Sequence, residues 1–315
     1  MSVLSEMRRR QAAYYYQEAA DLARKGQHAQ ALAALNRVIT LAPGHAEAHY
    51  LRGFELSHLG RHAEALADFD QVTALIPGRT DAGYQRGSQL SRLGRHSEAL
   101  AAVDEFLRMA PGNTIAMMLR GAELGVLHRE TEALAAFDAV LAREPGNAMA
   151  HYNRAMTLTG LGRGQEALAA YDRAVASAPD QAFFRIRKGI ALVGLGDVGS
   201  ALIEFDAAGR LQPQTAGEAA AWAAAILWHR GDDREARKRF ARVKGRLSGT
   251  AAFEAAELEA IARCALGDPD GAERALRDAK SRQGTARQDR LGPLYDLLST
   301  PPLTGVDRLR VIAAA

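Results

Sequence analysis

The chain has 315 residues, of which 48% are hydrophobic and 24% are charged. This balance excludes an intrinsically disordered chain, which would contain fewer apolar residues. The formal net charge of +3 is too small an excess to indicate a nucleic-acid-binding protein by itself.

The sequence also lacks a membrane-spanning run, a signal peptide and a pair of cysteines, and each absence excludes a class of protein. No apolar run approaches the ~20 residues that a membrane-spanning helix needs. Residues 1–13 carry charge but no apolar core of a signal peptide, so we expect a cytoplasmic protein. The single cysteine, Cys264, excludes an internal disulfide, and we expect it to be a small buried side chain.

Residues 1–11 are predicted to form a short basic N-terminal arm, and an internal repeat follows them. Six prolines recur at intervals of 34 residues: Pro43, Pro77, Pro111, Pro145, Pro179 and Pro213. An interval kept this regularly indicates stacked structural units that pack on their neighbours. The units run over residues 12–45, 46–79, 80–113, 114–147, 148–181 and 182–215.

Each unit is predicted to contain two helices with a tight turn between them. In residues 46–79 the turn contains Gly60, and the second helix ends before Pro77, because proline cannot extend a helix. The turn glycine recurs as Gly26, Gly94, Gly162 and Gly196. His128 takes its place once, so we expect that turn to be built slightly differently.

The two helices of a unit show complementary packing patterns. In the first helix a small residue such as Gly53 precedes a leucine such as Leu56 by three positions. In the second helix Ala65, Phe69 and Val72 have the spacing of one helical face. The small residue should allow the two helices to approach closely.

This pattern resembles the tetratricopeptide repeat (TPR), in its bacterial 34-residue form and unlike the Sel1 class. The resemblance covers the unit length, the small residue before leucine, the alanine–aromatic–valine triplet and the closing proline. It implies an all-α fold, a right-handed superhelical solenoid of antiparallel helix pairs. It also implies that the first helices line a concave groove.

The repeat pattern weakens toward the C-terminus. A seventh repeat, about residues 217–250, lacks the proline, and an eighth, 253–286, has Arg263 where leucine is expected. We therefore predict a solenoid of about eight repeats over residues 12–286, with the last two degenerate. Residues 287–315 are predicted to cap the stack or to reach into the groove, and self-association through this tail is an alternative.

The resemblance implies that the second, fifth, sixth, ninth and twelfth positions of each unit face the groove. From the fourth to the sixth repeat these positions are mostly apolar, which indicates an interaction site, and methionine suits adaptable binding. The tyrosines could instead only pack between repeats. The predicted partner-binding residues are Tyr50, Tyr84, Ile115, Met118, Met149, Tyr152, Asn153, Met156, Phe183, Ile186, Arg187 and Ile190.

These residues favour a non-catalytic scaffold or adaptor that binds a protein or peptide through an apolar or amphipathic segment. Only Asn153 provides an asparagine at the sixth position, so an asparagine ladder along a peptide backbone is not supported. Two alternatives stay open. The chain could be an accessory substrate-recognition subunit of a separate modification enzyme, or it could bind phosphate or nucleic acid through the basic helix 234–246.

The charged residues favour structural roles. Arg52, Arg86, Arg120, Arg154 and Lys188 recur with the same period as Asp70, Asp104, Asp138, Asp172 and Asp206. Matched ladders of opposite sign indicate ion pairs between helices rather than a phosphate-binding row.

Neither a metal site nor a catalytic site is predicted. His45 and His49 have the i, i+4 spacing of a metal-ligand pair, as do His58 and His62, but no cysteine or carboxylate accompanies them. No nucleophile elbow, phosphate-binding glycine loop or zinc-protease pair occurs. We predict no catalytic residue, no metal and no cofactor.

Overall fold

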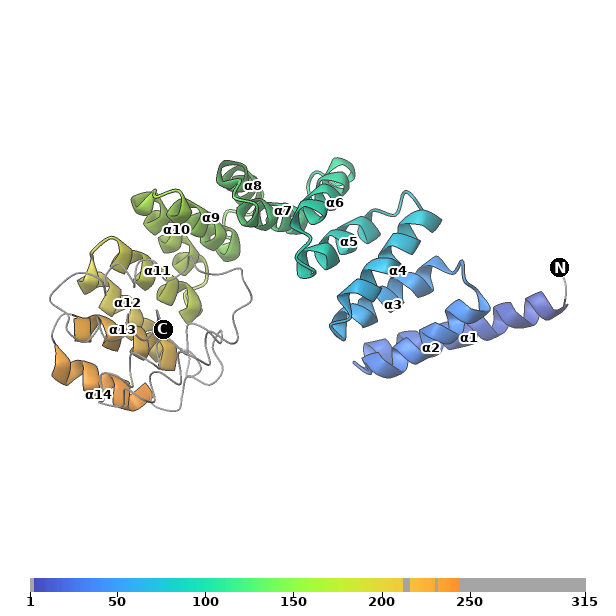
Figure 1. The fold of residues 1–315 in the computed structure, drawn as a ribbon, viewed down its shortest axis with the longest axis horizontal. Coiled ribbons are helices and arrows are strands. Elements are labelled where there is room, and N and C mark those ends of the chain that lie inside the picture. Colours follow the sequence, from blue (N-terminus) through green and yellow to red (C-terminus); the bar gives the residue numbers. More distant parts are fainter. Residues whose placement is uncertain (1–2, 212–215, 230–231, 244–315) are drawn as a thin grey trace, which may run out of the picture. The chain divides into compact units, whose positions relative to one another are not determined.

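The computed structural model of the chain describes residues 3–211, 216–229 and 232–243 (Figure 1). The described residues form 14 helices and no strand, which confirms the predicted all-α class. The chain divides into two units, residues 1–143 and 144–315, and each is described by itself. Cys264, the predicted eighth repeat at 253–286 and the predicted tail at 287–315 lie outside the described residues.

The first unit contains four helix pairs, and each helix packs on the next one in the chain. The helices are α1 (Val3–Arg24), α2 (His28–Leu41), α3 (Ala46–His58), α4 (His62–Leu75), α5 (Thr80–Arg92), α6 (His96–Met109), α7 (Thr114–Val126) and α8 (Glu130–Arg143). Residues 3–11, which we predicted as a separate arm, continue α1 without a break. Figure 1 shows this part of α1 extending past α2.

The second unit repeats the arrangement, again with each helix packed on the next. Its helices are α9 (Ala148–Gly160), α10 (Gly164–Ser177), α11 (Ala182–Gly194), α12 (Val198–Leu211), α13 (Ala216–His229) and α14 (Asp233–Val243). Helices α13 and α14 fall in the predicted seventh repeat. Among the described helices, none has the length and apolarity that crossing a membrane requires.

The close approach of the two helices in a pair depends on the small residue of the first helix. A Cβ atom on Gly121 would lie 2.6 Å from the Phe137 ring, and one on Gly53 would lie 2.8 Å from the Phe69 ring. Carbon atoms do not pack that closely without a shift. The predicted fit of a small residue against a large one is therefore confirmed.

The turn glycines adopt the left-handed conformation, with φ between 70° and 80° at Gly26, Gly60, Gly94, Gly162 and Gly196. His128 adopts the same conformation, with φ 55°. The N–H of Arg129 donates to the Leu124 carbonyl at 2.9 Å, and the N–H of Arg61 donates to the equivalent Leu56 carbonyl at 2.8 Å. Our expectation of a different turn at His128 is wrong: the backbone keeps the same turn, because histidine tolerates this region better than most residues.

Replacing His128 with glycine is expected to raise the free energy of unfolding by about 0.5 kcal/mol. A left-handed conformation costs a non-glycine residue roughly 1–2 kcal/mol, and the extra unfolded-state entropy of glycine offsets about half of that. Urea unfolding followed by circular dichroism measures the change. The reverse change at the equivalent turn, Gly94→Ala, should lower the midpoint. A lower midpoint for His128→Gly would contradict the strain argument.

Candidate partner-binding site

The first helix of each repeat carries the predicted binding residues, and these fall in both units. Tyr50, Tyr84, Ile115 and Met118 belong to the first unit, and the other eight belong to the second. The two groups therefore belong to different units of the chain. Their structural settings differ strongly.

On the first unit, Tyr50 lies at the centre of a closed polar cluster. The guanidinium carbon of Arg79 is 4.0 Å from the centre of the Tyr50 ring, a cation–π contact. Arg79 also donates to Glu47, and its Nε donates to Asp81 Oδ1 at 3.0 Å. Although burial opposes the charge of Arg79, these hydrogen bonds raise its pKa. Internal partners thus already occupy the polar groups around Tyr50.

Two more pKa changes follow from this cluster. Burial and a hydrogen bond with Asp81 raise the pKa of Tyr50 to about 12. Burial alone would raise the pKa of Asp81, but the hydrogen bonds from Arg79 and Tyr50 outweigh it and lower the pKa. The arrangement therefore holds an ionised carboxylate against a neutral phenol.

The shift at Tyr50 predicts a loss of stability in alkali. The folded chain holds the phenolic proton more tightly than the unfolded chain, so stability falls as pH rises from the ordinary tyrosine pKa of 10.0 to about 12. Tyr50→Phe should remove part of this loss. Urea midpoints measured between these pH values would test it, with Tyr14→Phe as the control. Equal alkaline loss in both variants and the wild type would contradict the prediction.

The other predicted residues of the first unit mostly pack between repeats. Tyr84 contacts Phe106 with ring centres 5.8 Å apart, within an apolar cluster of α5, α6 and α7. Met118 packs against the cluster that contains Phe137. Only Ile115 is well exposed, at 64% of its surface. Tyr84 therefore packs between repeats, as the alternative prediction for the tyrosines states.

On the second unit, aromatic side chains connect α9 and α11. The ring centres of Tyr152 and Phe183 are 5.0 Å apart in an edge-to-face arrangement, and Phe183 and Phe184 are 5.5 Å apart. Met149, one helical turn before Tyr152, is 48% exposed. Edge-to-face pairs of this kind stabilise by about 0.5–1.5 kcal/mol beyond their burial. The result is a rigid, partly exposed apolar surface.

Polar side chains border this apolar surface. The guanidinium carbon of Arg187 lies 5.1 Å from the centre of the Phe183 ring. The Tyr171 hydroxyl donates to the Met156 sulfur at 3.1 Å, and this contact holds Met156 in place. Asn153 and Ile190 are half-buried.

One predicted residue of this face is wrong. Ile186 is fully buried, at 1% exposure, and cannot line an open surface. Phe184, which was not predicted to take part in this face, is buried at the third position of its repeat. The earlier repeats carry alanine there, as at Ala48 and Ala82. That departure from the repeat pattern was the signal that could have identified it.

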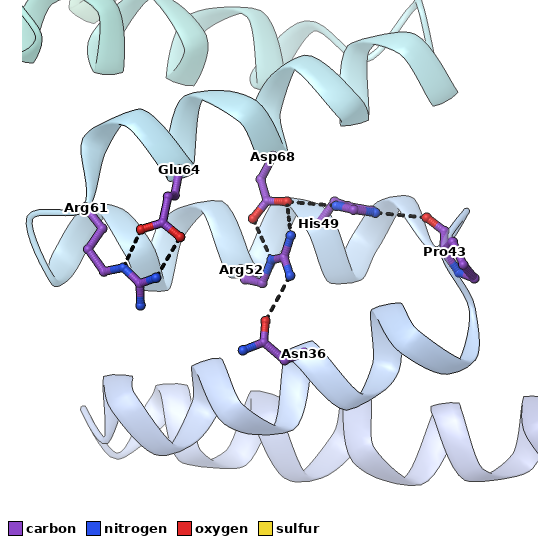
Figure 2. A network of polar contacts seen from close by, with 7 residues as sticks. All are labelled: Asn36, Pro43, His49, Arg52, Arg61, Glu64 and Asp68. Carbon is purple, nitrogen blue, oxygen red and sulfur yellow. Dashed lines mark hydrogen bonds and ion pairs between the residues drawn. The ribbon is translucent and has the colours of Figure 1, made fainter.

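The histidines take structural roles. His49 Nδ1 lies 2.8 Å from Asp68 Oδ1, and its Nε2 lies 2.9 Å from the Pro43 carbonyl oxygen, both within hydrogen-bonding distance (Figure 2). His28 bonds to buried Glu55 at 2.7 Å, and the repeat-equivalent His96 bonds to buried Glu123 at 2.8 Å. Each of the last two pairs joins one repeat to the next. Over the described residues, no group of three histidine, cysteine or acidic side chains could hold a metal ion.

Figure 2 shows Asp68 at the centre of a network that the sequence analysis missed. The Arg52 guanidinium donates to both Asp68 oxygens and to Asn36. The sixth repeat rebuilds the same arrangement with other residues: Glu204 accepts from Arg185 at 3.0 Å and from Lys188 at 2.6 Å. An acid at this position, buried at Asp68 and half-buried at Glu204, thus occurs together with cations at the facing positions.

The predicted ion-pair ladder is confirmed at three places, whereas Arg52 bonds instead to Asp68 and Asn36. Arg86 pairs with Asp70 at 2.6 Å, Arg120 with Asp104 at 2.6 Å, and Lys188 with Asp172 at 2.8 Å. In the seventh repeat Trp222 replaces the cation and stacks on Phe205. The partner of Asp206 is then Arg239 of α14.

This pairing weakens the basic-helix alternative. Of the cluster proposed over residues 234–246, Arg239 is engaged with Asp206, and Lys238 is 3.4 Å from Glu235. Arg234 and Arg237 are exposed on α14. Lys238 is exposed as well, so among the described side chains of this cluster Arg239 is held within the chain by an ion pair, and Arg234, Arg237 and Lys238 face solvent.

Comparison with known proteins agrees with the repeat architecture. A family model described as tetratricopeptide repeat matches residues 16–80 and 128–182. A search of curated proteins found no match. Among solved structures, the chain is similar to YrrB, described as a TPR protein with an unusual peptide-binding site, with 25% identity and a TM-score of 0.50. That likeness covers 57% of this chain and 94% of YrrB.

A second solved structure, that of MamA, matches in fold. The TM-score is 0.51 at 18% identity, over 55% of this chain and 94% of MamA. Both likenesses cover little more than half of this chain.

Proposed function

We propose that this chain, whose residues 16–80 and 128–182 match the tetratricopeptide repeat, serves as a scaffold for protein interactions. It binds a segment of a partner protein on the face of α9 and α11. The face consists of Met149, Tyr152, Asn153, Met156, Phe183, Arg187 and Ile190. The observation that carries the proposal is the edge-to-face contact of Tyr152 and Phe183 between the two helices, next to exposed Met149.

The chemistry of this face favours an apolar or amphipathic segment. Rigid aromatic rings supply contact area at little cost in conformational entropy, and methionine adapts to the shape of the bound side chain. YrrB, which is described as having an unusual peptide-binding site, supports a peptide as the kind of partner. An accessory subunit that presents substrates to a separate enzyme would use the same face.

The first unit is less suited to this role. Its corresponding face carries Arg79, which is already paired with Glu47 and Asp81, and Tyr84, which packs between repeats. A partner would have to break these contacts to bind there. We propose no catalytic step.

Selection of peptides from a random display library on the whole chain tests the proposal. We expect enriched peptides with apolar or aromatic anchors, and at least a tenfold loss of affinity in Met149→Glu, since the new charge would be desolvated in the complex. The control is Ile203→Glu, on α12, where the wild-type side chain is 68% exposed. If the selected peptides bind both variants with the same affinity as the wild type, the binding site lies elsewhere on the chain.

A further inference from the structure

The first helix of the stack exposes a position that is buried in the following repeats. The third position is alanine with no exposed surface in the next three repeats, at Ala48, Ala82 and Ala116. The second helix of the preceding repeat covers it there: Ala48 packs with Leu35 and Val38 of α2. Among the described residues no helix of an earlier repeat packs on the first repeat, which carries Tyr14 at this position. Tyr14 is 67% exposed.

Helix α1 is also longer than its equivalents, with 22 residues against 13 in α3. The additional turns add Met7, which is 62% exposed, and three exposed arginines at residues 8–10. Tyr15 is different, because Arg37 of α2 lies over its ring at 5.1 Å. The large apolar side chains on the outer side of α1 therefore have no cover among the described residues of the first unit.

The outer side of α1 has the spacing of a helix–helix seam. Met7, Arg10, Tyr14, Gln17, Asp21 and Arg24 follow one another at alternating intervals of three and four residues. This interval keeps side chains along one line of a helix that packs against another helix. Asp21 is half-buried and the other five side chains are exposed.

The seam is complementary to itself in the antiparallel direction. Around a centre between Tyr14 and Gln17, Arg10 of one helix faces Asp21 of the other, Tyr14 faces Gln17, and Met7 faces the stem of Arg24. Each of these contacts occurs twice, as two-fold symmetry requires. We propose that α1 is a homodimer interface, occupied by α1 of a second copy of this chain in antiparallel orientation.

Forming this interface breaks only a few existing side-chain contacts of α1. Asp21 accepts from Gln17 at 3.3 Å and from Arg24, and Arg10 is 3.3 Å from Glu6, all within the exposed part of α1. Exposed pairs within a helix contribute little to its stability, so exchanging them for contacts between chains costs little. A single helix pair buries roughly 1,000 Å² or less, which implies a weak dimer with a dissociation constant in the micromolar range.

Charge reversal on the whole chain tests the interface by sedimentation velocity at about 1 to 200 μM, a range that brackets a micromolar dimer. Arg10→Asp alone places two carboxylates together across the seam, and Asp21→Arg alone places two guanidinium groups together. We expect each variant to dimerise at least tenfold more weakly than the wild type. An equimolar mixture of the two variants should restore dimers, because every facing pair is then of opposite sign.

Arg108→Asp, the same charge change at an exposed position of α6, is the control and should leave the dimer unchanged. Circular dichroism should show equal helix content in all variants. A wild-type chain that stays monomeric throughout the concentration range would overturn the proposal. So would dimers that survive both reversals, or that disappear only when residues 287–315 are removed.

Discussion

Replacing Asp68 with alanine is expected to lower the free energy of unfolding of the first unit by about 3 kcal/mol. Asp68 is buried and accepts from His49 at 2.8 Å and from Arg52 at 2.7 and 2.8 Å (Figure 2). Without the carboxylate, His49 keeps only the Pro43 carbonyl, and the Arg52 guanidinium remains partly buried next to an apolar side chain. Removing one partner of a buried pair leaves the other charge uncompensated, which costs more than the pair contributes.

Asp70, two residues further along α4, gives a matched control. Its pair with Arg86 is equally short, at 2.6 Å, but Asp70 is exposed. Asp70→Ala should therefore cost under about 1 kcal/mol, because solvent screens an exposed ion pair. Urea unfolding followed by circular dichroism compares the two variants. Equal losses would show that burial does not determine the strength of this network.

The tryptophans separate the two units in this experiment. Both Trp222 and Trp228 belong to the second unit. Tryptophan fluorescence then reports the unfolding of the second unit, and circular dichroism reports both. Asp68→Ala should shift the dichroism transition and leave the fluorescence midpoint in place, unless the two units unfold cooperatively.

Phe137→Ala is expected to destabilise the first unit by about 3–5 kcal/mol. The Phe137 ring is buried in a cluster with Leu100, Leu124 and Ala133, and it fills the space left by Gly121. With Gly121 on α7 and an alanine in place of Phe137 on α8, neither helix has a side chain that can fill the resulting cavity. Met109→Ala, at an exposed site on α6, controls for the loss of an apolar side chain and should cost well under about 1 kcal/mol.

A double-mutant cycle tests this packing directly. In the wild type, Gly121→Ala should cost about 1–2 kcal/mol, because the new methyl group would lie 2.6 Å from the Phe137 ring. In the Phe137→Ala background the same change meets no ring and should stabilise by about 0.5–1 kcal/mol through helix propensity. The same cost in both backgrounds would mean that the ring and the glycine do not interact.

Much of the fold followed from the sequence. The 34-residue interval of the prolines predicted the helix pairs, the turn glycines predicted the turns, and the small residue at Gly53 predicted a close approach of the two helices. The structure confirms all three, and it shows that Phe69 is the side chain that packs on Gly53. The shared 34-residue period of the arginines and aspartates was enough to predict the ion pairs of Arg86 and Arg120. These features are local or join neighbouring repeats, so a period in the sequence carries them directly.

The candidate site followed only in part. Spacing placed Met149, Tyr152 and Phe183 on first helices, but it could not show that Ile186 is buried or that Tyr84 packs between repeats. Exposure depends on which side chains of the neighbouring helix fill the space, and these change from repeat to repeat. The buried network of Asp68 was missed for the same reason.

The sequence by itself thus determined the repeat, its helices and the glycines on which close packing depends. Only the tertiary structure decided which side chains stay exposed: Met149 beside the aromatic pair of the second unit, and Tyr14 on the uncovered side of α1. The physical reason is that a repeat pattern specifies how each unit meets its neighbour, whereas a binding surface forms where the neighbour is absent or leaves apolar groups uncovered.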